Sequence, residues 1–389
     1  YSLVRNPDID TAYNALITYV IPGSPAAQAG LERGDWIMKV DTSYISKKYE
    51  TYLLQGTKAV KLTLGEWKEV EIEDEEDGNE GGDGEDEGPT MEYRVVPIDD
   101  PVEMPAAQIV EDNPVHKYEI IESPVKKIRV GYLMYNSFTA GTKAEPEKYN
   151  NELRSVSQKF KEAGVQAVIL DLRYNEGGSM DCVQLLGTIL TSADRLGEPM
   201  AYLEYNDKNT DKDATILFGT DREINLNLHS LIAITSGTTM GAPEMLIRSL
   251  FLEDTYPIAT VGSSTKGQNV ATEQFINEEF LWSVNPVVCT VYNSQHDTYG
   301  AISPATDLKV SETTIDGSTN YSEFLPFGTF DKDGKSERLL KIAIGVLDGT
   351  YPPKDDETPE ESTTQTRFKV EKSVSSPASR RFSSKGLRL

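Results

Sequence analysis

The sequence predicts an α/β protein with a crotonase/ClpP-like mixed-sheet core and a smaller β-rich domain before it. From Ile128 onward, apolar strand-like segments alternate with amphipathic helical segments, which is typical of an α/β domain with parallel strands. Before Ile128, short strand-like segments are separated by turns that contain glycine. A chain of 389 residues is long enough for two such domains.

These patterns suggest the domain boundaries. We expect a β-rich domain over residues 1–115, a connector over 116–125, the α/β core over 126–349 and a tail over 350–389. The tail is rich in proline, serine and charge, so we expect it to be extended and to pack loosely on the core.

Much of the acidic charge lies in one insertion at residues 73–88. The stretch Glu71–Glu87 contains 11 acidic residues and no lysine or arginine, and the formal net charge of the chain is −25. The stretch lacks the ligand spacing of an EF-hand calcium loop. We therefore expect a solvated loop that joins two strands of the first domain.

Composition excludes several classes of protein. A strongly acidic chain lacks the basic surface of a general nucleic-acid binder. Cys182 and Cys289 are too few for a disulfide framework, and apolar runs such as Ala167–Leu170 are too short to span a bilayer. The chain begins at Tyr1 without a methionine, which is compatible with a removed export signal.

The first domain contains a dense motif over Gly23–Ile37. Ser24 suits a helix N-cap, Pro25 the first helical position and Gly30 the C-terminal cap, before a strand at Trp36–Val40. The stretch Gly-Ser-Pro-Ala-x-x-Ala-Gly-Leu-x-x-Gly-Asp-x-Ile resembles a PDZ domain of the bacterial protease type. This resemblance implies capture of a peptide by strand addition, through residues that the sequence does not identify. The alternative is a rigid spacer or lid.

The second domain is expected to alternate strands and helices. Pro146 and Gly164 bracket one expected helix, Gly349 closes another, and the middle strands are largely apolar, as in a sheet buried on both faces. We expect strands at Ile128–Tyr135, Val165–Leu172 and His229–Thr235, and helices at Glu147–Ala163, Met180–Leu190, Ala242–Phe251 and Leu339–Leu347.

Two turns in this domain join a buried strand to a helix. Asp171–Gly178 reads Asp-Leu-Arg-Tyr-Asn-Glu-Gly-Gly, and Thr235–Glu244 follows the next buried strand. Glycines before a helix let backbone amides face a negative charge, as in an oxyanion hole. A phosphate-binding P-loop is excluded because no Gly-Lys-Ser/Thr follows.

With both turns in this order, the chain resembles the carboxyl-terminal processing (tail-specific) serine protease family. That family joins a PDZ domain to a crotonase-like core, and Gly300–Pro304 with Asp307 loosely matches a further stretch near the end of its core. The resemblance implies a polypeptide or protein C-terminus as partner. From composition and motifs we also expect no metal or cofactor, no nucleic acid and no transmembrane span. The resemblance also implies an exported protein, periplasmic or anchored to the envelope.

The chain departs from this family at the catalytic positions. Family members carry Ser-Ala-Ser-Ala-Ser-Glu or Thr-Ala-Ser-Ala-Ser-Glu, with the nucleophile at the central serine, and an activating lysine further on. Thr239–Glu244 places Gly241 at the nucleophile position. The lysine position falls on Gln268 when the glycines are aligned, or on Lys266 when residues are counted. By analogy, the oxyanion donors are Gly177, Gly178 and the amide of Ala242.

Three hypotheses follow. The first is a catalytically impaired protease homologue that still binds polypeptide, because glycine has no nucleophile and glutamine no titrating base. The second is an active serine-type endopeptidase with a displaced nucleophile, drawn from Ser236, Thr238 or Thr239. The third is a non-enzymatic envelope scaffold. The three histidines match none of the family's catalytic positions, and no Cys-His cluster suggests zinc.

Overall fold

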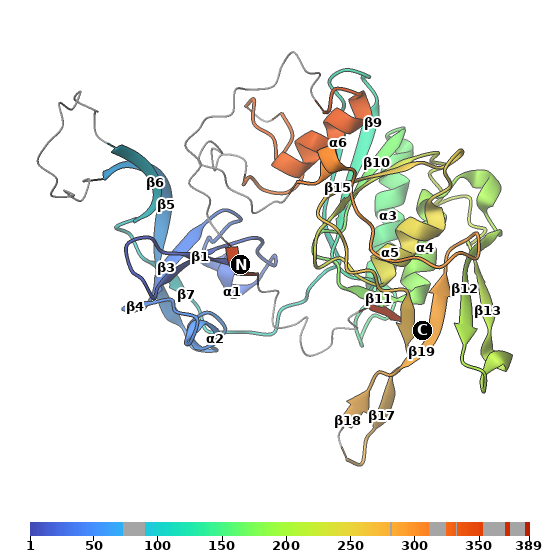
Figure 1. Cartoon of the computed structure of the whole chain (residues 1–389), viewed down its shortest axis with the longest axis horizontal. Coiled ribbons are helices and arrows are strands. Elements are labelled where there is room, and N and C mark those ends of the chain that lie inside the picture. The colour runs from blue at the N-terminus through green and yellow to red at the C-terminus, as the bar shows by residue number, and fades with distance from the viewer. Residues whose placement is uncertain (73–89, 281, 311–323, 332, 353–369, 374–385) are drawn as a thin grey trace, which may run out of the picture. The chain divides into compact units, whose positions relative to one another are not determined.

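The computed structural model divides the chain into two compact units, each described by itself below (Figure 1). The structure describes residues 1–72, 90–280, 282–310, 324–331, 333–352, 370–373 and 386–389. The acidic insertion predicted at 73–88 therefore lies outside the described residues. Unit 1 comprises Tyr1–Asp112, Thr313–Pro326 and Pro359–Pro377, and unit 2 comprises Asn113–Glu312, Phe327–Thr358 and Ala378–Leu389.

Unit 1 is β-rich, as the sequence predicted. The helix expected after Ser24 is present, and the Ser24 hydroxyl accepts a hydrogen bond from the amide of Ala27 at 3.2 Å. The elements are β1 (Ser2–Arg5), β2 (Tyr13–Leu16), α1 (Pro25–Gln28), β3 (Trp36–Val40), β4 (Ser43–Tyr44), α2 (Glu50–Leu54), β5 (Val60–Ile72), β6 (Thr90–Pro97), β7 (Val102–Met104) and β20 (Val370–Ser373).

The strands of unit 1 form one sheet in the order β20-β1-β2-β3-β5-β6, with β4 beside β3 and β7 beside β5. Successive side chains of a strand point to opposite faces, and both faces are apolar here. Leu3 and Ile37 join one buried cluster, whereas their neighbours Val4 and Trp36 join a second. Burial on both faces holds the first strand firmly in the sheet.

Unit 2 is an α/β fold with two larger sheets and a separate two-stranded hairpin. Its helices are α3 (Lys148–Glu162), α4 (Met180–Leu190), α5 (Ala242–Leu250) and α6 (Arg338–Asp348), with short 3-10 turns at Ala193–Arg195, Thr210–Lys212 and Thr306–Leu308. Its strands are β8 (Val115–Glu122), β9 (Arg129–Tyr135), β10 (Ala167–Asp171), β11 (Gly177–Ser179), β12 (Pro199–Tyr205), β13 (Ala214–Leu217), β14 (Leu231–Thr235), β15 (Ile258–Gly262), β16 (Val270–Thr272), β17 (Phe275–Asn277), β18 (Trp282–Val284), β19 (Val287–Tyr292) and β21 (Gly386–Arg388).

The first sheet of unit 2 runs β15-β14-β10-β9-β8, and only β8 is antiparallel to its neighbour. The second sheet runs β11-β21-β16-β19-β12-β13. Side chains of α3, α4 and α5 share one buried cluster with residues of both sheets, such as Leu170 and Val291, whereas α6 contacts β14 and β15. The helices expected from the sequence are all present, with ends within a few residues of those expected.

Two of the expected boundaries need correction. Most of the predicted connector, residues 116–125, belongs to strand β8, which pairs antiparallel with β9 and buries Val115 and Ile121. The tail does not pack loosely where it is described. Strand β21 lies between β11 and β16, and Leu387 is 1% exposed, so this part of the tail belongs to the core.

A buried arginine connects the central strand β10 to helix α6. The guanidinium of Arg173 lies between Asp171, at 2.7 Å, and Glu337, at 2.8 Å, and the hydroxyl of Tyr132 donates to Asp171 at 2.8 Å. Glu337 also caps α6 by accepting from the amide of Leu340. All three charged side chains are fully buried, so each carboxylate depends on the arginine for compensation.

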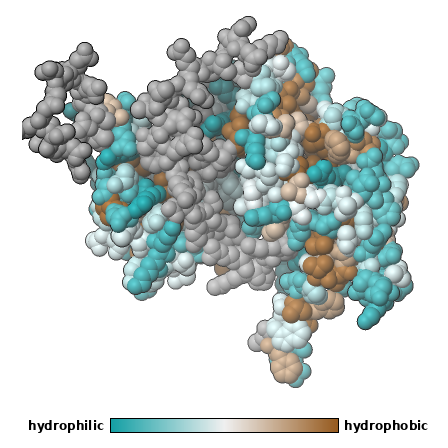
Figure 2. Space-filling model, viewed as in Figure 1, coloured by the Kyte–Doolittle hydropathy of each residue, from teal (hydrophilic) through white to brown (hydrophobic). Residues whose placement is uncertain are grey.

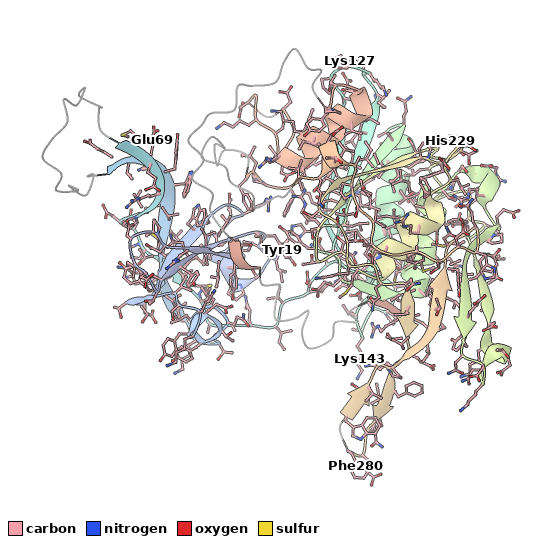
Figure 3. All side chains as sticks on the ribbon, viewed as in Figure 1. Tyr19, Glu69, Lys127, Lys143, His229 and Phe280 are labelled. Carbon is pink, nitrogen blue, oxygen red and sulfur yellow. The ribbon has the colours of Figure 1, made fainter. Side chains whose placement is uncertain are left out.

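A hairpin of β17 and β18 carries exposed apolar side chains, with Phe280 near its tip (Figures 2 and 3). Phe275, Ile276 and Trp282 are exposed beside it. An apolar surface of this kind is typical of one that another molecule covers. Among the described residues, no helix combines the length and the hydropathy that a transmembrane span requires.

Replacing Arg173 by methionine should destabilise unit 2. We expect Arg173→Met to lower the free energy of unfolding by about 3–5 kcal/mol, because it leaves two buried carboxylates without a counter-charge. The triple variant Asp171→Asn, Arg173→Met, Glu337→Gln removes both carboxylates and should be more stable than Arg173→Met alone. Urea denaturation of the variants measures the difference, and a triple variant less stable than the single one would contradict this account.

Candidate active site

The two predicted turns lie at the same edge of the first sheet of unit 2. Strands β10 and β14 are adjacent and parallel, so the turns that follow them meet. The amide of Met240 in the second turn donates to the carbonyl of Asn175 in the first, at 3.2 Å. The two turns are therefore in direct contact through their backbones.

Asn175 organises the first turn from within. Its amide nitrogen Nδ2 donates to the carbonyl of Tyr135 at 2.8 Å, and its Oδ1 accepts from the amide of Gly177 at 2.9 Å. The N–H of Gly177, a predicted oxyanion donor, is thus already engaged. Gly178 has φ of 140°, and a Cβ there would lie 2.2 Å from the carbonyl oxygen of Phe138, so the close approach of these chains requires glycine.

The second turn bends sharply at Gly241, the predicted nucleophile position. Gly241 has φ of 70° and ψ of −104°, a conformation that side-chain-bearing residues rarely adopt. A strained turn between a strand and a helix is also how hydrolases of other folds present a nucleophilic serine. Ala242, the third predicted oxyanion donor, opens α5 directly after this bend and is fully buried.

A buried carboxylate, that of Glu244, joins this bend to the loop that contains the predicted lysine position. Its Oε2 accepts from the amides of Gly241 at 2.9 Å and Gln268 at 2.8 Å. Its Oε1 accepts from the amide of Gly267 at 2.5 Å and from the hydroxyl of Thr265. One oxygen atom therefore holds Gly241 and Gln268 next to each other, which sequence spacing alone did not show.

The two candidates for the base differ in their surroundings. Lys266 is exposed, while its backbone amide donates to the carbonyl of Thr239 at 3.0 Å. Gln268 is half-buried, and its Oε1 is shielded from solvent without a hydrogen-bond partner among the described residues. The assignment of Gln268 or Lys266 to the family's lysine position stays a prediction.

The hydroxyls near Gly241 are all occupied. Thr239 Oγ1 donates to the carbonyl of Leu172 at 2.8 Å, and Thr238 Oγ1 donates to that of Arg173 at 2.8 Å. Ser236 Oγ also donates to the carbonyl of Arg173. These bonds fasten the second turn to the first and match the backbone-bonding role that such residues usually have.

The two thiols are poorly suited to nucleophilic attack. Burial raises the pKa of Cys182 to about 12 and that of Cys289 to about 11, with nearby acidic groups adding to both effects. A protonated thiol is not a nucleophile, so neither cysteine is activated near neutral pH. Of the histidines, His229 is exposed and His296 pairs with Glu204 at 2.8 Å.

Comparisons with known proteins agree with this architecture. A model of peptidase family S41 matches residues 129–284, and a PDZ domain model matches residues 16–63. A solved structure of a protein assigned as an S41 protease from Bacteroides fragilis is 38% identical, with a TM-score of 0.74, covering 90% of this chain and 82% of that one. The chain belongs to peptidase family S41.

Other solved structures of S41 proteases are more distant. The photosystem II D1 C-terminal processing protease is 16% identical, with a TM-score of 0.41, over 76% of this chain and 68% of that one. Mature CPAF is 12% identical, with a TM-score of 0.38, over 78% of this chain and 76% of that one. A comparison with curated protein sequences found no match.

In this S41 chain, sequence reasoning missed the residues that hold the site together. Glu244 was recognised only as the end of a motif, although its place three residues after Gly241 is that of a capping-box glutamate. A capping box is normally recognised by a serine or threonine at the N-cap, and this helix has glycine there. No local sequence pattern marks Glu337 or Leu387 as part of the site. Their partners Arg173 and Gly178 are more than 160 residues away along the sequence.

Replacing Glu244 by glutamine should loosen both turns. Glutamine offers one oxygen where the carboxylate offers two, and its amide group faces other donors, so we expect Glu244→Gln to cost about 3 kcal/mol of stability. Hydrogen exchange at the amides of Gly241 and Gln268 should accelerate. Glu253→Gln, the same change at an exposed glutamate, serves as the control, and equal effects of the two changes would contradict the role given to Glu244.

Proposed function

We propose that this S41 homologue binds extended polypeptide and is impaired in cleaving it. The observation that carries the proposal is the pair Gly241 and Gln268, held side by side by Glu244 Oε2. These are the positions that the family motif assigns to the nucleophile and its lysine. Neither residue present can perform the assigned step.

The chemistry of acyl transfer explains the expected impairment. Glycine has no side chain to attack a carbonyl, and a glutamine amide does not take up a proton near neutral pH. In another serine protease, loss of the nucleophile reduces turnover about a million-fold. What remains in this chain is the backbone around the site and the PDZ-like unit.

The main alternative is an active peptidase with a displaced nucleophile. Ser236, Thr238 and Thr239 are its candidates, yet their hydroxyls donate to the carbonyls of Leu172 and Arg173. Lys266, the alternative base, is exposed. The contact that joins two of these candidates, from the backbone amide of Lys266 to the carbonyl of Thr239, does not involve the groups that would react. No feature of the described residues is specific to a non-enzymatic scaffold.

The proposed partner is a polypeptide or a protein C-terminus. A PDZ unit recognises extended peptide through main-chain hydrogen bonds, and the S41 core supports the same class of ligand. We also propose an exported location, periplasmic or envelope-anchored, because proteases that this chain resembles are exported. Fractionation of cells that make the natural protein tests the location.

Restoring both catalytic side chains should restore cleavage. We expect the natural chain to cleave an unfolded substrate such as casein no faster than a blank, and the double variant Gly241→Ser, Gln268→Lys to cleave it measurably. Serine at a φ of 70° should also cost about 1–3 kcal/mol of stability, because a side chain there strains the backbone. Release of casein fragments and thermal melting measure the two effects.

The matched control is Gly241→Ala, Gln268→Lys, which introduces the same strain and the same lysine but no hydroxyl. It should be inactive and equally destabilised. Cleavage by the natural chain would refute the proposed impairment. Failure of the natural chain to bind labelled unfolded casein would refute the proposed binding function.

A further inference from the structure

The sheet of unit 1 ends in a strand from the opposite end of the chain. Strand β20 (Val370–Ser373) pairs antiparallel with β1 (Ser2–Arg5) and with no other described strand. Ser2 lies opposite Ser373 and Leu3 opposite Lys372, and the register shifts before Val4 meets Val370. Without β20, one edge of β1 would present unpaired amide and carbonyl groups, which form a template for another strand.

Strand β1 is itself held rigidly. Ser2, Leu3 and Val4 are fully buried, and the opposite edge of β1 pairs with β2. Its backbone is therefore already in the extended form that an added strand requires, and a ligand need not bear the cost of ordering it.

Helix α2 (Glu50–Leu54) borders the beginning of this strand. The hydroxyl of Tyr1 hydrogen-bonds to Glu50 and accepts from Gln55 Nε2 at 3.1 Å. Leu53 and Leu54 pack against the same apolar cluster as Leu3. A strand edge with a helix at its side is suited to an extended polypeptide, whose main chain bonds to the strand.

We propose that this edge of β1 is the polypeptide-binding edge of unit 1, and that Val370–Ser373 occupies it as an internal competitor. The inference rests on the proposed polypeptide-binding function and adds its regulation. Because β20 belongs to the same chain, its competition is intramolecular, and its effective concentration at β1 does not fall when the protein is diluted. An external polypeptide binds by displacing β20 and adding in its place, with the same main-chain bonds.

The test weakens β20 through its backbone in the full chain. Successive amides of a strand point to opposite sides, so Glu371→Pro, Lys372→Pro removes a donor toward β1 whichever of the two faces it. Glu371→Ala, Lys372→Ala removes the same charges and keeps both amides. The readouts are hydrogen exchange at Leu3 and Val4, and the affinity for a fluorescent peptide copying residues 368–375.

We expect the proline variant to exchange the β1 amides at least tenfold faster than the alanine control and to bind the peptide at least tenfold more tightly. Unchanged exchange would overturn the proposal and leave the proposed function untouched. Faster exchange of the β1 amides without tighter binding of the peptide would overturn the proposed competition between β20 and external polypeptide. If, in that case, labelled casein is not bound either, the proposed function fails as well.

A second variant tests the inference in the opposite direction. Ser2→Cys, Ser373→Cys places a thiol on each of two residues that lie opposite each other in the ladder, so oxidation locks β20 in place. Cys182 and Cys289 are buried and do not compete for this pairing. The oxidised form should bind the peptide at least tenfold more weakly than the reduced form, and equal affinities would overturn the proposal.

Discussion

The ion pairs around Arg173 are the interaction on which the rest of unit 2 depends. The guanidinium neutralises Asp171 at the end of the central strand and Glu337 at the start of α6, while the carbonyl of the same residue accepts hydroxyls from the second turn. One residue thus fixes a strand end, a helix start and both turns of the site. Burial also raises the pKa of Tyr132 well above its usual range, and the nearby Asp171 charge adds to this effect, so its hydroxyl remains a donor to Asp171.

The candidate site combines a tightly bonded backbone with Gly241 and Gln268, which we propose stand at the family's nucleophile and lysine positions. The Glu244 carboxylate accepts hydrogen bonds from the main-chain amides of Gly241, Gly267 and Gln268, so one buried side chain satisfies several main-chain donors at once. Such a frame does not need a nucleophile to remain folded. Membership of family S41 therefore describes the architecture of this chain, and its chemistry has to be argued from the side chains of the site.

Local patterns predicted much of this structure. Helix α4 has the predicted bounds, and α1 begins at the predicted serine, because capping and periodicity depend on neighbours in sequence. Strand β8 was mistaken for a connector, and β21 for loose tail, because both are fixed by strands distant in sequence. In the site, the motif located Gly241, but no local pattern could show that Glu244 brings it to Gln268.

The conformation of Gly241 has an evolutionary consequence. A side chain at this bend costs stability, so a lineage that exchanged a serine here for glycine would have gained thermodynamic margin as it lost cleavage. Other destabilising substitutions can then accumulate, because the added stability offsets their effect. In such a lineage, reversion to serine would become harder with each of them, because the serine would again strain this bend.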